Sequence, residues 1–306
     1  MERNYRMHSP LIKKMLLLAL CAAILLFSAT NNRAWAAELN QILKDGKLRH
    51  LGIVYANFVT EDRQGLDIEL MTLFAEHLGV TYEFVETDWQ NILPDLIGNI
   101  VRSRGEEVEL LEEHPVRGDV IATGFTILPW RKKVVDFSEI TFPTGVWLIA
   151  RADSPLRPIA PTGDIQNDIT RAKTGLEGVS VLGLKESCLD PDLYGIGDTG
   201  ATIKFFPIDR NLDEMIPSVI AKMADATLMD VPVALIALEK WPGEIKVVGP
   251  ISPHQGMACA FAKNTPDLRR AFEVFFTRLK ADGKYKQLVQ KYYPSLFLYY
   301  PEFLAN

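Results

Sequence analysis

Apolar positions along this chain alternate between short continuous runs and runs with helical spacing. Residues 48–54 and 80–85 form apolar runs typical of buried strands. Between them, Ile68, Met71, Phe74, Ala75 and Leu78 recur at helical spacing over 67–78. A second helix is expected after Trp89, followed by a strand at 119–122. This succession of strands and helices predicts an α/β fold.

One pattern occurs twice in the chain and predicts two similar units. "ILPDLIGNI" leads to "GDVIATG", and "MIPSVIAKM" leads to "ADATLMD". Each copy is a helix with proline in its first turn, followed by an apolar strand that contains aspartate. Two such units indicate two α/β lobes, and ligands of α/β sheets bind beyond the carboxyl ends of the strands. The first copy contains a charged insert at about 101–117. We expect this insert to be a solvated, surface-exposed segment, and the sequence does not assign it a role.

The first 36 residues have the pattern of a secretory signal peptide. Arg3, Arg6, Lys13 and Lys14 precede an apolar run over 15–29, and the sequence "AWA" over 34–36 matches a cleavage site. The alternative is a membrane anchor, but the run is shorter than the roughly 20 residues that span a bilayer. We therefore expect cleavage before Ala37 and export of the mature protein to an oxidising compartment.

The charge of the mature chain argues against nucleic acid as a partner. Removing residues 1–36 takes away five basic residues and one acidic residue, which changes the formal charge from -6 to -10. Nucleic-acid binding depends on basic surfaces. The two remaining cysteines, Cys188 and Cys259, could form a disulfide in an oxidising compartment or remain buried thiols.

A glycine, a threonine and an arginine follow the strand at 119–122. Gly124 allows close approach of the backbone to a ligand, Thr126 supplies a hydroxyl, and the Arg131 guanidinium matches the geometry of a carboxylate. The alternative is a basic surface turn, because two lysines follow Arg131 directly. Both interpretations fit the spacing.

Asp230 ends the apolar run of the second unit and precedes a predicted helix, "VPVALIALEKW". Its carboxylate could cap that helix. Placed across a cleft from Arg131, it would instead bind a cation, and the two side chains together would suit a zwitterion. Ser187 and Cys188 lie in a turn near a predicted helix start, where backbone N–H groups could bind an anion or simply cap the helix.

Several other features carry weaker signals. Tyr55, Phe58 and Trp89 follow strands and could line an apolar pocket or belong to the core. "GIGDTG" fits the G-x-G-x-x-G pattern of dinucleotide-binding loops, but a strand is predicted after it, where that motif requires a helix. The histidines lack metal-ligand spacing, and no hydrolase or phosphate-loop motif is present. We expect no cofactor and no metal.

Five segments in order along the chain resemble those of the periplasmic solute-binding proteins of polar amino acid ABC transporters, solute-binding family 3. They are "GLDIELMTLFAEHLGV", "DWQNILPDLI", "GFTILPWRKKVVDFS", "DATLMDVPVAL" and "LRRAFEVFFTRLKADGKYKQLVQKYYP". The resemblance covers about residues 45–294. It implies a two-lobed, hinge-connected periplasmic binding protein fold of type II, with lobe 1 at 38–147 plus 254–306 and lobe 2 at 148–253.

The resemblance also implies roles for the site residues. Gly124, Thr126 and Arg131 match the segment that binds the α-carboxylate of the ligand, and Asp230 matches the aspartate that binds its α-amino group. Ser187 and Cys188 fall in the second-lobe turn that assists the carboxylate. Tyr55, Phe58 and Trp89 fall near the positions that line the side-chain pocket. The second-lobe turn departs from the family pattern. It reads "KESC", whereas the family commonly has lysine and glycine followed by threonine or serine.

The resemblance implies that the mature protein lies in the periplasm. The function implied is capture of an amino acid or a similar zwitterion by a monomer that delivers it to an ABC transporter permease. Two alternatives remain. One is a periplasmic enzyme on the same scaffold, similar to cyclohexadienyl dehydratases, with Lys185 or Glu186 as the acid or base. The other is a sensory role, in which the closed form docks on a receptor.

Overall fold

The computed structural model describes residues 38–105, 107–207, 210, 212–300 and 302–304. The predicted signal peptide at 1–36 lies outside the described residues. Within them, no helix has both the length and the apolarity needed to cross a membrane. Cys188 and Cys259 are both free and buried, so they remain thiols in this structure.

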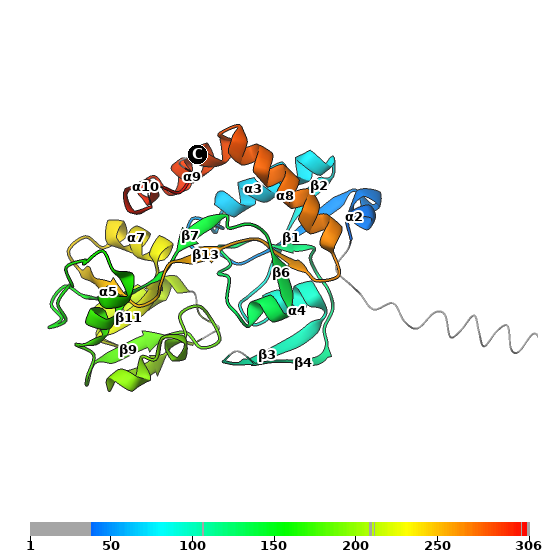
Figure 1. Ribbon diagram of the computed structural model, residues 1–306. Coiled ribbons are helices and arrows are strands. Elements are labelled where there is room, and N and C mark those ends of the chain that lie inside the picture. Colours follow the sequence, from blue (N-terminus) through cyan, green and yellow to red (C-terminus); the bar gives the residue numbers. More distant parts are fainter. Residues whose placement is uncertain (1–37, 106, 208–209, 211, 301, 305–306) are drawn as a thin grey trace, which may run out of the picture. The chain divides into compact units, whose positions relative to one another are not determined.

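The first sheet is formed by residues from both ends of the described chain. Its five strands have the order β2-β1-β5-β14-β6 (Figure 1). β1 pairs in parallel with β2 and β5, whereas β14 is antiparallel to β5 and β6. The strands are β1 (Lys47–Gly52), β2 (Thr81–Glu86), β5 (Val120–Ile121), β6 (Val135–Phe137) and β14 (Ala260–Ala262).

The second sheet repeats the order and the strand directions of the first. Its order is β10-β9-β11-β8-β12, with β9 parallel to β10 and β11, and β8 antiparallel to β11 and β12. β5 and β11 therefore occupy equivalent positions, as the sequence repeat indicates. The strands are β8 (Val146–Arg151), β9 (Ser180–Gly183), β10 (Thr202–Phe205), β11 (Ala226–Asp230) and β12 (Ile245–Pro250).

The chain passes twice between the two sheets. β7 (Phe142–Thr144) precedes the second sheet, and β13 (Gln255–Met257) follows it. These two segments pair with each other in antiparallel register, with Gly256 opposite Pro143. The result is a two-lobed α/β fold whose lobes are joined by paired crossing strands, the fold class that the sequence predicts.

Helices cover both sheets. In the first lobe, α3 and α8 lie on one side of the sheet and α4 on the other (Figure 1). α3 and α8 share a buried aromatic contact, Phe74 against Phe272, with ring centroids 5.2 Å apart. The helices are α2 (Leu39–Asp45), α3 (Leu66–Leu78), α4 (Ile92–Ile97), α5 (Ile165–Lys173), α6 (Met215–Ile220), α7 (Val231–Lys240), α8 (Pro266–Ala281), α9 (Lys284–Tyr292) and α10 (Leu296–Tyr299). Short 3-10 turns are η1 (Arg131–Lys133), η2 (Pro191–Tyr194), η3 (Gly197–Thr199) and η4 (Leu212–Glu214).

The charged insert is solvated and has a regular structure. It contains an antiparallel β-hairpin, β3 (Asn99–Arg104) and β4 (Glu107–Glu113), and β3 packs against α4. The buried Asp95 carboxylate on α4 fixes the chain that leaves the hairpin. It pairs with His114 Nε2 at 2.8 Å and Arg117 Nη1 at 2.9 Å, and it accepts the Thr87 hydroxyl at 2.6 Å. None of the described residues over 101–117 is buried, so the hairpin is solvated as expected, and His114 and Arg117 after β4 attach it to the lobe.

We expect Asp95→Ala to lower the free energy of unfolding by about 2 kcal/mol, because it removes the buried acceptor of Thr87, His114 and Arg117. Urea unfolding of the mature protein measures the change. Glu109→Ala is the control, since it removes only an exposed partner of Arg102 at 3.6 Å and should cost under about 1 kcal/mol. Equal losses in the two variants would contradict the anchoring role of Asp95.

Candidate functional site

Arg131 is a buried cation with few partners. It begins the 3-10 turn η1 and is 3% exposed. Its Nη1 donates to the Thr126 carbonyl at 2.9 Å, and its guanidinium carbon lies 4.0 Å from the centre of the Phe125 ring. Its Nε has no hydrogen-bond partner within the described part of the chain. Burial lowers the pKa of Arg131 to about 10, so the side chain stays charged at neutral pH.

Asp230 is a buried carboxylate with one free oxygen. It ends β11 and occupies the N-cap position of α7, but its side chain makes no capping hydrogen bond. Its Oδ2 instead accepts the Tyr55 hydroxyl at 2.6 Å and the Cys188 thiol at 3.1 Å. Its Oδ1 has no partner among the described residues. Burial raises the pKa of Asp230, while the bonds from Tyr55 and Cys188 and the charge of Arg131 oppose that rise.

The two charges share a site but do not neutralise each other. Among the described residues, no ion pair within 4.0 Å joins Arg131 to Asp230, although their charges influence each other's pKa. Burying an ion without a matched partner costs several kcal/mol. An incompletely satisfied buried cation and an incompletely satisfied buried carboxylate in one site are complementary to a ligand that carries both charges.

The turn before η2 brings Ser187 and Cys188 to the site. The Ser187 hydroxyl donates to the Leu184 carbonyl at 2.8 Å and accepts the Leu189 N–H at 2.9 Å, so it stabilises the turn itself. The Cys188 thiol donates to Asp230, and burial raises the pKa of this thiol well above its usual value. The helical turn begins only at Pro191, where Asp190 is the cap.

Two polar residues that the sequence did not single out complete this network. The Tyr194 hydroxyl donates to the Cys188 carbonyl at 2.5 Å. Gln255, on the crossing strand β13, donates to the Tyr194 hydroxyl at 3.1 Å, and its buried Oε1 has no partner among the described residues. Tyr194 lies six residues after Cys188, close to the turn that the sequence did single out, which was a partial signal. Gln255 belongs to no motif, so nothing in the sequence indicated it.

Gly124 and Phe58 lie in packed surroundings. Gly124 has φ +59°, and its N–H donates to the buried Asp67 carboxylate at 2.7 Å. A Cβ at Gly124 would lie 2.5 Å from the Phe58 ring, so only glycine fits without displacement. Phe58 packs on Phe142 at 5.0 Å between ring centroids, next to the crossing strands. Thr126 is also buried, and its hydroxyl has no partner among the described residues.

A cavity of about 320 Å³ reaches Arg131 from the outside. Trp89 and the residues that follow it, which lead into α4, form one wall, and 184–187 form another. Trp89 is half-buried and its ring contacts Tyr55 edge to face, with centroids 5.6 Å apart. Phe125 and Trp130 line the cavity beside the guanidinium. The structure thus brings Arg131, Ser187 and Trp89 to one cavity. Asp230 is not among the residues that line it, and connects to Trp89 through Tyr55.

No group of three or more His, Cys, Asp or Glu side chains in the described ranges could hold a metal ion.

The sequence profile of the bacterial extracellular solute-binding proteins, family 3, matches residues 112–295. The chain belongs to this family. The hairpin strand β3 and the first two strands of the first sheet precede the matched range.

A curated relative and two solved structures are similar to this chain. Membrane-bound lytic murein transglycosylase F of Desulfosudis oleivorans is 25% identical over 238 residues, which are 77% of this chain and 45% of the relative. This family 3 chain therefore spans less than half the length of that relative. A mutant of ArgBP from T. maritima has a TM-score of 0.65 at 24% identity, covering 84% of this chain and 99% of its own. An ancestral amino acid-binding protein, a precursor of cyclohexadienyl dehydratase, has a TM-score of 0.64 at 26% identity, covering 83% and 98%.

The Asp67 carboxyl that fixes Gly124 should give the protein a measurable pH dependence. Burial raises the pKa of Asp67 from 3.8 to about 7, although the Gly124 N–H opposes the rise. The folded state therefore binds more protons than the unfolded state between these values, and stability falls as pH rises from about 4 to about 7. Asp67→Asn keeps an oxygen that accepts the Gly124 N–H but cannot titrate. The free energy of unfolding of this variant should therefore fall by about 2 kcal/mol less than that of the wild-type protein between pH 5 and pH 8.

Urea unfolding of the mature protein and the variant at both pH values measures this difference. Burial lowers the pKa of His50 to about 4, and His50 therefore adds stability as pH rises toward 6.5. This effect is present in both proteins and cancels in the comparison. Parallel pH profiles for the two proteins would show that Asp67 does not titrate as described.

Proposed function

We propose that this protein captures a free amino acid or a similar small zwitterion. Arg131 binds the carboxylate of the ligand and Asp230 binds its ammonium group. The observation that supports this proposal is the pair of buried, opposite charges that the protein itself leaves short of partners. A ligand with both charges supplies the missing hydrogen bonds in a site where burial strengthens them.

The other predicted residues support these two contacts. Tyr55 and Cys188 orient the Asp230 carboxylate, and the unpartnered Thr126 hydroxyl is available to the ligand carboxylate. Gly124 provides the turn rather than an N–H donor, because its N–H already donates to Asp67. Ser187 fixes the second-lobe turn, Trp89 forms the side-chain wall of the cavity, and Phe58 supports the turn at Gly124 from the core.

We further propose that lobe 1, residues 38–147 plus 254–306, and lobe 2, residues 148–253, close over the ligand by bending at β7 and β13. The predicted signal peptide at 1–36 would direct the chain to the periplasm. There the closed monomer delivers the ligand to an ABC transporter permease in the inner membrane. Docking on a receptor for sensing would use the same closed form, and a permease gene next to this one would favour transport.

Arg131→Gln should reduce ligand affinity at least tenfold, because it removes the charge-assisted hydrogen bonds to the carboxylate. The mature protein is unfolded and refolded to remove any bound ligand, and its melting temperature is then measured with each common amino acid. A ligand present at about 100 times its Kd should stabilise the wild-type protein by about 2.7 kcal/mol. At the same ligand concentration the variant should keep at most about half of this stabilisation. Its ligand-free state should lose no stability, since the change removes an incompletely paired buried charge.

Lys132→Gln is the matched control, because Lys132 lies in the same 3-10 turn but is exposed. It should bind the ligand as the wild-type protein does. An Arg131→Gln protein that binds with wild-type affinity would rule out Arg131 as the carboxylate site.

An enzyme on the same scaffold is the second candidate. Lys185 and Glu186 line the cavity that reaches Arg131, which places an amine and a carboxylate next to the proposed ligand. One structural relative is also a precursor of cyclohexadienyl dehydratase. Incubating the purified protein with prephenate or arogenate distinguishes the two functions. Turnover that is lost in Glu186→Gln would favour the enzyme, whereas recovery of every bound compound unchanged would exclude it.

A further inference from the structure

The cavity that reaches Arg131 continues into a larger one beneath the hairpin. The second cavity has a volume of about 520 Å³ and extends from the hairpin strand β3 to the turn η2. Five residues line both cavities, so the two adjoin: Ser103, Trp130, Lys185, Glu186 and Ser187. Small-molecule sites commonly have volumes of about 300 to 1,000 Å³. The inner cavity alone already falls in this range, and the outer one adds room for a longer ligand.

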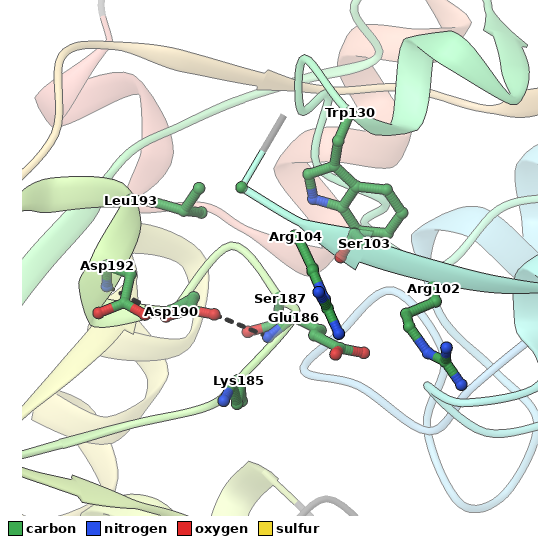
Figure 2. Close-up of a pocket in the computed structure, with 11 residues that line it drawn as sticks. Arg102, Ser103, Arg104, Trp130, Lys185, Glu186, Ser187, Asp190, Asp192 and Leu193 are labelled. Atoms are coloured by element: carbon green, nitrogen blue, oxygen red, sulfur yellow. Dashed lines mark hydrogen bonds between the residues drawn. The ribbon is translucent and has the colours of Figure 1, made fainter. Parts of the chain in front are cut away.

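The hairpin side of the outer cavity carries two guanidinium groups. Arg102 and Arg104 are both exposed and line the cavity, and Arg104 extends toward the turn that carries Glu186 (Figure 2). Arg102 has one exposed partner, Glu109, at 3.6 Å. Arg104 has no ion pair within 4.0 Å in the described part of the chain. Lys185 adds less positive charge to the cavity, because its ammonium lies over the Phe205 ring, 5.5 Å from the ring centre.

The opposite side of the outer cavity is acidic, but part of its charge is already used. The Asp190 carboxylate accepts the Glu186 N–H at 2.9 Å and the Asp192 N–H at 3.0 Å (Figure 2). Glu186 has φ +59°, a left-handed conformation that is costly for a residue with a side chain. The Asp190 bond fixes this conformation and keeps the exposed Glu186 side chain at the junction of the two cavities. There its carboxylate can accept an amide N–H of a ligand.

The hairpin is attached firmly enough to make a specific contact. β3 packs on α4, and Asp95 of α4 bonds to His114 and Arg117 where the chain leaves the hairpin. The same helix begins in the wall of the inner cavity. Ser103, which lies between Arg102 and Arg104, also lines the inner cavity together with Arg131, so the two arginines lie beside the proposed ligand.

We propose that the ligand is an amino acid whose side chain is extended by an amide-linked unit ending in a second carboxylate, as in a γ-glutamyl dipeptide. This inference rests on the proposed function, because Arg131 and Asp230 bind the α-carboxylate and α-amino groups. The extension passes Trp130 and Ser187, its amide N–H donates to Glu186, and its terminal carboxylate binds Arg104 and Arg102. A free amino acid fills only the inner cavity.

Calorimetric titration of the refolded mature protein with three probes tests this proposal. The probes are glutamate, γ-glutamylglycine and γ-glutamylglycinamide, and the last two have the same length but differ in the terminal charge. We expect γ-glutamylglycine to bind about five- to tenfold more tightly than the amide, as an exposed charge-assisted contact allows. The double variant Arg102→Gln, Arg104→Gln should remove this preference. Arg63→Gln, an exposed arginine on Glu86 at 3.8 Å, is the control and should retain it.

Three outcomes overturn the proposal. Equal affinity for γ-glutamylglycine and its amide, or a preference that survives in a correctly folded double variant, excludes an anionic subsite under the hairpin. Binding of amino acids without binding of either dipeptide probe also excludes it, but leaves the proposed function in place. If neither the probes nor any amino acid binds, the proposed function fails and this inference fails with it.

Discussion

Two buried charges of opposite sign determine how the rest of this structure is arranged. Arg131 and Asp230 are each almost fully buried, and each has a polar atom without a hydrogen-bond partner among the described residues. Such groups lower stability unless something completes their hydrogen bonds. Tyr55 and Cys188 satisfy one oxygen of Asp230, and Thr126 satisfies one nitrogen of Arg131. Among the described residues, no ion pair within 4.0 Å joins the two charges to each other.

The repeated sheet explains how two distant charges reach one site. β5 and β11 occupy the same position in sheets of the same order. Arg131 follows β5, and Asp230 is the last residue of β11. After β5 the chain turns at Gly124, whose N–H is bound by Asp67, and then reaches Arg131. After β11 the chain enters α7 directly, so Asp230 stays at the strand end. One duplicated unit therefore presents a cation in one lobe and an anion in the other.

The sequence predicted the elements whose pattern is local and missed contacts that join distant segments. Helical spacing gave α3 almost to the residue, and the repeated pattern located both β5 and β11. Asp67 was recognised only as the start of a helix, because its partner Gly124 lies 57 residues away. Gln255 and Tyr194 were missed for the same reason. In the insert, the alternation of apolar and charged residues over "EVELLEE" fits a strand, but the density of charge concealed it.

The hairpin and Arg131 are separate in the sequence but line the same cavity. In the proposed function, the buried pair recognises the two groups that every amino acid has, so it gives affinity without distinguishing one amino acid from another. Discrimination must come from residues farther along the cavity, where Trp130, Glu186 and the hairpin arginines lie. If the hairpin arginines bind a second carboxylate as proposed, the hairpin that Asp95 attaches to α4 extends the range of ligands. This extension leaves unchanged the two buried charges to which we assign the binding of the amino acid itself.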